Sequence, residues 1–199
     1  MKVIFSEDFY QVYTGDPAAA PGRIESVFKT IEPHVEFVTA KKADRQNIAA
    51  VHSSMHIQHI ENQGLYEIAS LAAGGAIQSA QIGLSEPCFG LIRPPGHHAS
   101  AISSWGFCYF NNMAVAMVAL HRQKIIESAC VLDIDLHFGD GTVNILNRHG
   151  WVSVVNIESQ SRISYMQQVE AAMEDCQADL IGISSGFDNH AADWGGLLA

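Results

Sequence analysis

Short apolar and β-branched runs alternate along the chain with longer stretches in which apolar residues recur at helical spacing. The short runs predict strands at residues 2–5, 35–38, 88–93, 129–133, 151–157 and 179–184. The longer stretches predict helices at residues 43–61, 67–83, 111–123, 141–148 and 164–176. Strands that alternate with helices imply βαβ crossovers, so the pattern predicts an α/β fold with a parallel sheet covered by helices on both faces.

The chain has the size of one domain. It contains 199 residues, of which 48% are hydrophobic, and no linker or change of composition divides it. We therefore expect a single domain over residues 1–199. The sequence stops at Leu197, Leu198 and Ala199, directly after a predicted loop and without a closing helix or strand.

Three polar clusters follow three of the predicted strands. They are RPPGHH at residues 93–98, DIDLHFGD at residues 133–140 and GFDNH at residues 186–190. In parallel α/β sheets, ligands bind in the crevice at the carboxyl ends of the strands. We therefore expect the three clusters to meet in space and to form the functional site.

Asp135 and His137 are the strongest candidates for metal ligands. They stand two residues apart, so in an extended segment their side chains leave on the same face. A carboxylate oxygen and an imidazole nitrogen suit zinc, which in catalytic sites takes three protein ligands and keeps one position open. Asp188, at the end of another strand, is the best third ligand. The alternative, in which the aspartates are loop caps and His137 is a satisfied loop histidine, is weakened by the other two clusters.

His97 and His98 follow a Pro-Pro-Gly segment, which favours a stiff turn. Adjacent histidines on such a loop serve as metal ligands or as groups that transfer protons near neutral pH. A buried imidazole of this kind needs a carboxylate behind it to fix its tautomer, and Asp133 and Asp140 flank the proposed ligands. An ordinary surface pair of histidines is the alternative.

The charge balance argues against a nucleic-acid-binding protein. The chain carries 11 basic and 21 acidic residues, a formal net charge of -10, and it has no basic stripe. An acidic surface favours a cationic partner or substrate, and it also serves solubility. The 4 cysteines include no CxxC pair, so neither a zinc ribbon nor a thioredoxin-type site is indicated.

No segment has the pattern of a signal peptide or a membrane span. The N-terminal segment becomes acidic at residues 7 and 8, too soon for a signal peptide. The longest uncharged stretch, residues 68–85, is rich in Ala, Gly, Ser and Gln, which indicates a packed helix. We expect a cytoplasmic protein with reduced thiols and no membrane partner.

These motifs resemble those of the zinc-dependent histone deacetylase and acetylpolyamine amidohydrolase family, which has the arginase–deacetylase fold. In the family's order, the matching stretches are DPAAAPGRIESV (16–27), VHS (51–53), RPPGHHA (93–99), WGFCYFNN (105–112), VLDIDLHFGDGT (131–142) and SSGFDNH (184–190). The resemblance extends over residues 1–199 and implies a three-layer α/β/α architecture with hydrolase activity.

The resemblance assigns roles residue by residue. It makes Asp135, His137 and Asp188 the ligands of one zinc ion per chain. It makes His98, hydrogen-bonded to Asp140, the general base that takes a proton from the metal-activated water.

Further roles follow from the same resemblance. His97, backed by Asp133, is implied to stay largely protonated and to stabilise negative charge or protonate the leaving amine. Phe107, preceded by Gly106, is implied to line the tunnel that holds the acylated chain. Arg23 resembles an arginine behind the zinc, on the path by which acetate leaves. A monovalent cation, usually K+, is implied near Asp133, held by backbone carbonyls.

The implied reaction is hydrolysis of the acyl amide of acetyl-lysine or of an acetylated polyamine. Zinc lowers the pKa of a bound water to about 7, so a histidine base then needs only modest tuning. The substrate partner is therefore an acylated amine, and we expect no nucleic-acid partner.

A catalytic tyrosine of the family lies in a Gly-rich segment downstream of the last residue of this sequence. None of the 5 tyrosines stands in such a context. We expect that the C-terminal part of the family fold is missing from residues 1–199 and that hydrolysis by this chain is weak or absent. An apolar sheet edge left uncovered would favour a homo-oligomer or pairing with another chain.

Two other functions stay open at this point. An arginase-like manganese hydrolase shares the fold, but it commonly uses a D-x-H-x-D arrangement, and the residue two after His137 is Gly139. A catalytically weak or inactive metal-binding or interaction protein is favoured by the missing tyrosine. The two complete histidine–aspartate pairs favour an enzyme.

Overall fold

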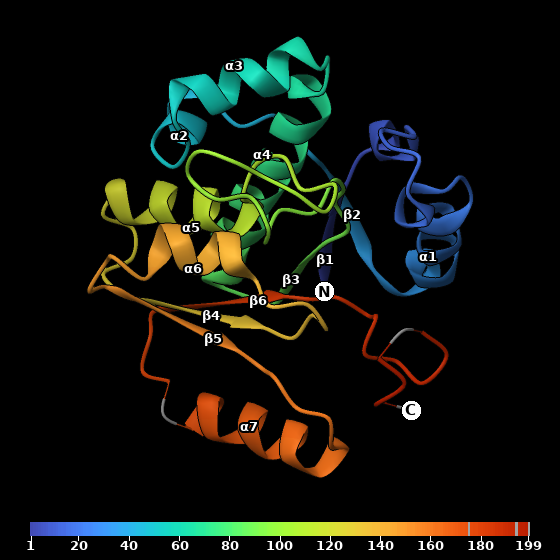
Figure 1. Ribbon diagram of the computed structural model, residues 1–199, viewed down its shortest axis with the longest axis vertical. Coiled ribbons are helices and arrows are strands. Elements are labelled where there is room, and N and C mark those ends of the chain that lie inside the picture. Colours follow the sequence, from blue (N-terminus) through green and yellow to red (C-terminus); the bar gives the residue numbers. More distant parts are fainter. Residues whose placement is uncertain (175, 194, 199) are drawn as a thin grey trace.

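The computed structural model describes residues 1–174, 176–193 and 195–198. The strands in this part of the chain pair in parallel and form two three-stranded sheets (Figure 1). In the first sheet, β1 (Lys2–Phe5) lies between β2 (Glu36–Thr39) and β3 (Cys88–Gly90).

In the second sheet, β4 (Ala129–Asp133) lies between β5 (Val152–Asn156) and β6 (Leu180–Ser184). Asp133, the last residue of β4, is level with Asn156 on one neighbour and with Ser184 on the other. The predicted parallel α/β fold is confirmed, with the strands divided between two sheets.

The connections between the strands are mostly helical. The helices are α1 (Arg23–Ile31), α2 (Arg45–Ala49), α3 (Ser54–Asn62), α4 (Tyr66–Gly83), α5 (Asn112–Arg122), α6 (Asp140–Leu146) and α7 (Arg162–Glu174), with short 3-10 helices η1 (Glu7–Tyr10), η2 (Pro17–Ala19) and η3 (Glu32–His34).

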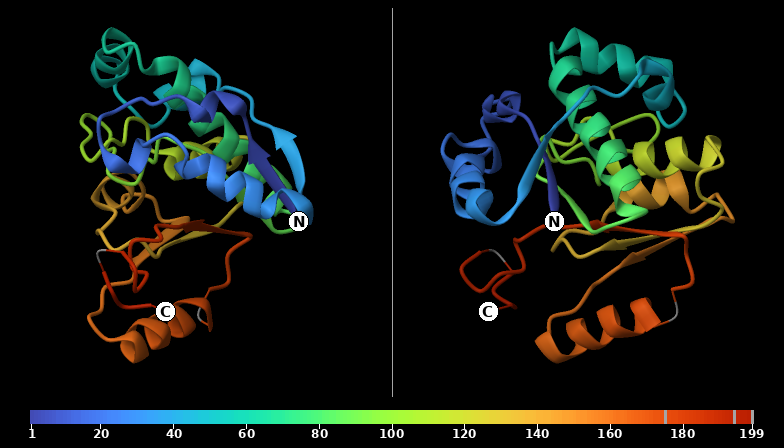
Figure 2. Two further views of the ribbon diagram at one scale, coloured as in Figure 1. Left: turned by 90° about the vertical axis from the view of Figure 1, so that its right-hand side faces the viewer. Right: turned by 180° about the vertical axis from the view of Figure 1, so that it is seen from behind.

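Helix α4 is the central helix of the N-terminal half. Its Ile68 and Leu71 pack in one core cluster with Val3 and Ile4 of β1, whereas its Ala73 belongs to the larger cluster that includes α5 and β4. Figure 2 shows α1 and α4 on opposite sides of β1 and β2. Both flanks of α4 are buried, and its sequence carries almost no charge. This burial accounts for the uncharged stretch from which a packed helix was predicted.

The second sheet is also covered on both faces. Ala129 and Val131 of β4 pack in the cluster that includes α5, whereas Leu132 packs with Tyr165 of α7 on the other face. Figure 1 shows α5 and α6 on one side of this sheet and α7 on the other. The result is a three-layer α/β/α arrangement, as the sequence resemblance implied. Alternation along β4 places Asp133 on the face of Ala129 and Val131.

Some predicted boundaries were wrong. The helix expected over residues 43–61 is divided into α2 and α3, because the Ser53 side chain accepts the His56 N–H and caps a new helix. The Ser53 N–H also binds the Ala101 carbonyl, which holds the break in place. Helix α1 was not predicted, and the strand predicted over residues 88–93 ends at Gly90.

None of the helices in the described part of the chain combines the length and the hydropathy that a bilayer-spanning helix requires.

Candidate functional site

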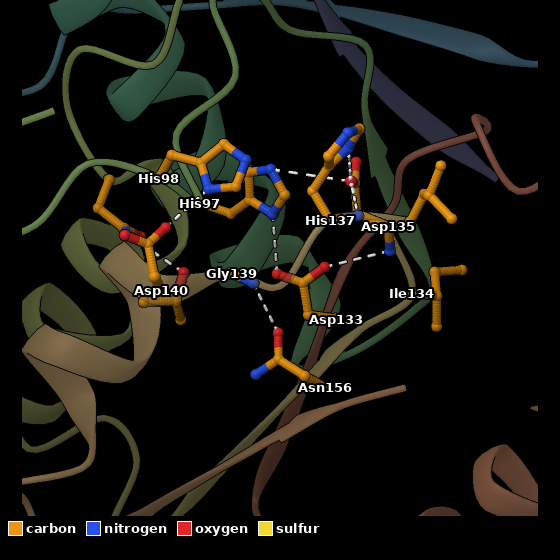
Figure 3. Close-up of polar contacts among 12 residues, drawn as sticks. His97, His98, Asp133, Ile134, Asp135, His137, Gly139, Asp140 and Asn156 are labelled. Carbon is orange, nitrogen blue, oxygen red and sulfur yellow. Dashed lines mark hydrogen bonds and ion pairs between the residues drawn. The ribbon is translucent and has the colours of Figure 1, made fainter. Parts of the chain in front are cut away.

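The three polar clusters meet at the carboxyl ends of the strands, as the sequence predicted. His97 and His98 stand on the loop that follows β3, Asp135 and His137 on the loop between β4 and α6, and Asp188 on the loop after β6. Figure 3 shows His97 beside Asp133, the last residue of β4, and His98 beside Asp140, the first residue of α6. Side-chain contacts between the three loops join the clusters into one site.

Asp135, His137 and Asp188 form the candidate metal site. Each offers one ligand atom, and the three atoms lie within 4.8 Å of one another. The His137 Nδ1 atom is 3.1 Å from Asp135 Oδ1 and 2.9 Å from Asp188 Oδ2. Two carboxylate oxygens and one imidazole nitrogen are a donor set that zinc accepts in catalytic sites. These residues therefore fit a divalent metal, and they are the only such group found among the described residues.

Backbone contacts hold the metal-site loops together. The Leu136 N–H donates to Asp188 Oδ1 at 3.0 Å, and the His137 N–H donates to Asp135 Oδ1 at 2.8 Å. Gly186 passes so close that a Cβ atom there would lie 1.8 Å from Asp135 Oδ2, so only glycine fits this crossing. Gly186 therefore allows the loop after β6 to lie directly against the loop after β4.

The charges of this cluster favour a cation. Burial raises the pKa of Asp135; nearby His97 and the hydrogen bond from the His137 N–H lower it, Asp188 raises it further, and the net shift is upward. Two carboxylates brought together out of water repel each other, and a bound cation relieves that repulsion.

His97 is paired with Asp133. Its Nδ1 atom lies 3.1 Å from Asp133 Oδ2, and the Asp133 side chain is 1% exposed. The other carboxylate oxygen accepts the Asp135 N–H at 3.2 Å. Burial lowers the pKa of His97, but the hydrogen bond to Asp133 and the surrounding negative charges outweigh burial, so its pKa lies above the ordinary value. The pair therefore favours a protonated His97.

His98 is paired with Asp140, the first residue of α6. Its Nδ1 atom lies 2.7 Å from Asp140 Oδ1. Burial and the proximity of His97 lower the pKa of His98, and Asp140 offsets this only in part. Two adjacent histidines thus have pKa values shifted in opposite directions, which is the pattern expected of an acid and a base.

The loop that carries the histidines is anchored by buried polar groups. The His52 Nδ1 atom is 2.9 Å from the Ser100 carbonyl oxygen, and its Nε2 accepts the Asn111 N–H at 2.9 Å. The Asn111 side chain donates to the Ala99 carbonyl at 3.0 Å. Burial, followed by the nearby His56, lowers the pKa of His52 to about 3, so this histidine is neutral in the folded protein.

Gly106, Phe107 and Arg23, the residues expected to bind substrate, differ in their burial and backbone conformation. Gly106 and Phe107 adopt left-handed backbone conformations, with φ of 56° and 52°, and Phe107 is half-buried against the N-terminal core. Arg23 is exposed on α1. Arg93 is instead buried, and its Nε donates to the Phe9 carbonyl.

Several residues that shape the site were not found from the sequence. Asn156, at the end of β5, accepts the Gly139 N–H at 2.8 Å and so fixes the turn into α6 (Figure 3). Its position at a strand end was the available signal. Tyr165 donates its hydroxyl to the Ile134 carbonyl at 3.0 Å, which supports the metal-site loop from the α7 side. No sequence pattern pointed to that contact.

Comparisons with known proteins agree with this geometry. Residues 18–165 match the model of the histone deacetylase domain family. A probable deacetylase of Methanothermobacter thermautotrophicus is 28% identical over 86% of this chain and 69% of its own length. A histone deacetylase-like amidohydrolase of Pseudomonas aeruginosa is 30% identical over 65% of this chain, and a polyamine deacetylase HDAC10 of Danio rerio is 25% identical over 70%.

The chain spans only part of most of these relatives. The matched regions make up 44% of the Pseudomonas protein and 26% of the Danio protein. The solved HDA15 HD domain has the same fold, with a TM-score of 0.85 and 21% identity over 99% of this chain and 75% of that one. The family match covers the histidine pair, both paired aspartates and two of the three candidate metal ligands, and the chain belongs to the histone deacetylase domain family.

Proposed function

We propose that this chain is a zinc-dependent amidohydrolase that removes the acyl group from an acylated amine, either acetyl-lysine or an acetylated polyamine. The observation that carries the proposal is the arrangement of two histidine–aspartate pairs beside the Asp135–His137–Asp188 cluster. The names of the relatives support deacetylation as the reaction class.

Asp135, His137 and Asp188 would hold the metal. When bound there, zinc supplies a Lewis acid that polarises an amide carbonyl and makes water a stronger acid. The choice of zinc over other divalent ions rests on the donor set and on the family resemblance. A monovalent cation near Asp133 remains a prediction from that resemblance.

His98 would serve as the general base. Its Nδ1 atom faces Asp140, so Nε2 is the atom left to accept a proton. Its lowered pKa keeps this nitrogen unprotonated at neutral pH. A general base must be unprotonated before the reaction, so that it can take the proton of the attacking water.

His97 would serve as the acid or as the stabiliser of negative charge. Its Nδ1 faces Asp133, and its raised pKa favours the protonated ring. The protonated Nε2 would then donate to the developing oxyanion or to the leaving amine. Because Asp133 is 1% exposed and also accepts the Asp135 N–H, His97 is held in one orientation.

An amine substrate suits the charge of the protein. The net charge of -10 attracts cations, and a polyamine or a lysine-rich peptide carries positive charge. The proposed substrate class therefore includes both, and their relative rates distinguish a peptide deacetylase from a polyamine deacetylase.

Acetate release after metal exchange tests this proposal. The chain is stripped with a chelator, dialysed and reloaded with zinc or with manganese, and acetate is measured with an acetyl-lysine peptide and with an acetylated polyamine. We expect release only by the reloaded protein, and we expect it to be slow, because none of the tyrosines of residues 1–199 stands in the context of the family's catalytic tyrosine. Equal release by stripped and reloaded protein would exclude a metal-dependent reaction, and manganese-restricted release would favour the arginase-like alternative.

A further inference from the structure

Trp105 forms contacts with both members of the His98–Asp140 pair. The indole ring stacks on the His98 imidazole with a centroid distance of 3.6 Å and an angle of 26° between the ring planes. The indole N–H donates to both Asp140 oxygens, at 3.0 Å and 3.2 Å. Each of the three side chains therefore contacts the other two: His98 and Trp105 both bind the Asp140 carboxylate, and their rings stack on each other.

The local backbone is shaped for this stacking. Gly106, the next residue, has φ of 56°, and a Cβ atom there would lie 3.0 Å from His98 Cδ2. A side chain at residue 106 would push the loop away from the imidazole, so glycine permits the close approach. Trp105 and Gly106, which are adjacent in sequence, therefore both lie against the His98 ring.

Asp140 needs a second partner to stay in one orientation. Its side chain is 48% exposed, whereas the His98 side chain is 6% exposed. Water competes for an exposed carboxylate, and a fixed N–H donor reduces that competition. Trp105 itself is 54% exposed, so most of its surface contributes little to the core. A structural role in folding therefore does not explain its contacts.

We propose that Trp105 is a positioning residue that holds the His98–Asp140 pair in its reactive orientation. The indole N–H fixes the carboxylate, and the indole face limits rotation of the imidazole. The inference rests on the proposed role of His98 as the base, and it assigns Trp105 a role that acts through the His98 ring and the Asp140 carboxylate.

Two substitutions separate the contributions of the indole. Trp105→Phe keeps an aromatic face but removes the N–H donor, and Trp105→Leu removes both. Trp151→Phe is the matched control, because Trp151 stacks on His121 with a centroid distance of 4.0 Å in another part of the chain. Thermal unfolding of each variant shows whether the fold is kept.

The direct readout is the NMR signal of the His98 Nδ1–H, which needs neither metal nor substrate. It is assigned by its loss in His98→Ala. We expect faster exchange of this proton with water in Trp105→Phe, and faster still in Trp105→Leu, with unchanged exchange in Trp151→Phe. We also expect an upfield shift of the Trp105 indole N–H in Asp140→Asn, because its charged acceptor is lost.

Kinetics of the zinc-loaded chain provide the second readout. Loss of a residue that orients a site group typically costs about 10–100-fold, so kcat is expected to fall by that amount in Trp105→Leu with KM little changed. Unchanged kcat together with unchanged His98 proton exchange in both Trp105 variants would overturn the inference. A rise in KM alone would assign Trp105 to substrate binding and would overturn it as well. If the wild-type chain releases no acetate, the proposed function fails, and the NMR comparison still decides the role of Trp105.

Discussion

The His137 Nδ1 atom lies 2.9 Å from Asp188 Oδ2, although the two residues follow different strands, β4 and β6. Asp188 is further fixed by the Leu136 N–H, which donates to its other oxygen at 3.0 Å. Together with Asp135, these side chains present one nitrogen and two carboxylates to a common point. Such a group is stable when it shares a cation and is repulsive when it does not.

The first prediction concerns metal content. Asp135→Ala, His137→Ala and Asp188→Ala are each expected to lose stoichiometric zinc, because a catalytic zinc site depends on all three protein ligands. Metal per chain is measured by mass spectrometry after dialysis, with the exposed Asp44→Ala as the control. Full zinc occupancy in Asp188→Ala would remove Asp188 from the ligand set.

The second prediction concerns the buried carboxylate behind His97. Asp133→Asn keeps the size of the side chain but removes its charge, so His97 loses the partner that raises its pKa. Hydrolysis is expected to fall by about 10–100-fold, as for other residues that orient a site group. The free energy of unfolding is expected to fall by about 1–3 kcal/mol, because a buried charged hydrogen bond is weakened.

Steady-state rates and urea unfolding measure the two effects of Asp133→Asn separately. Zinc content is expected to stay near that of the wild type, because Asp133 is not in the proposed ligand set. An unchanged rate would mean that the His97–Asp133 contact is structural and has no part in the reaction.

The sequence was sufficient for the fold class and for the convergence of the site. Strand-end position is a topological property, so the polar residues after β4 and β6, which are neighbours in one parallel sheet, had to lie near each other. The loop after β3 belongs to the other sheet, and it joins the site through the His97–Asp133 and His98–Asp140 contacts. The break between α2 and α3 was missed, because the apolar pattern continues through it. It is Ser53, through its side-chain cap and its N–H bond to Ala101, that ends the helix there.

The third prediction concerns pH and stability. The pKa of His52 is about 3 in the folded chain, against 6.5 for an unperturbed histidine. Above pH 6.5 the ring is neutral in both states. Below it only the unfolded chain takes up the proton, so stability is lost as pH falls from 6.5 toward 3. Between pH 7 and pH 5 this histidine alone accounts for a loss of about 2 kcal/mol.

Urea unfolding at the two pH values of wild type and of His52→Gln measures this contribution. The variant is expected to lose less stability between pH 7 and pH 5 than the wild type does. The exposed His34→Gln serves as the control and is expected to follow the wild type. Identical pH dependence in wild type and His52→Gln would contradict a neutral, buried His52.

The fourth prediction concerns self-association. Ile181 and Ile183 of β6 are 43% and 54% exposed, and β6 is an outer strand of its sheet in the described part of the chain. Apolar side chains beside an unpaired strand edge favour association. We expect Ile181→Lys/Ile183→Lys to shift the protein toward monomer in sedimentation velocity. A monomeric wild type at the highest soluble concentration would contradict this expectation.

The residues that position the site were harder to predict than its reactive groups. His97, His98 and Asp135 stand in motifs with a recognisable chemistry. The two-residue spacing of Asp135 and His137 predicted an extended segment, whereas the structure brings the two side chains together in a bend after β4. Trp105 lies in an irregular loop, where no periodicity indicates which way a side chain points. Its contact with Asp140 depends on the path of the backbone through Gly106, which only the folded structure specifies.

The most direct test of the central claim is a single-turnover assay with His98→Ala. Zinc-loaded wild type and variant are each mixed, in excess, with an acetyl-lysine peptide or an acetylated polyamine, and acetate is followed over time. A general base contributes roughly 10²–10⁴-fold, so the variant is expected to release acetate that much more slowly while it retains the same zinc content. Equal rates in wild type and variant, or no acetate from either substrate with zinc-loaded wild type, would contradict the assignment of this chain as a deacetylase that uses His98 as its base.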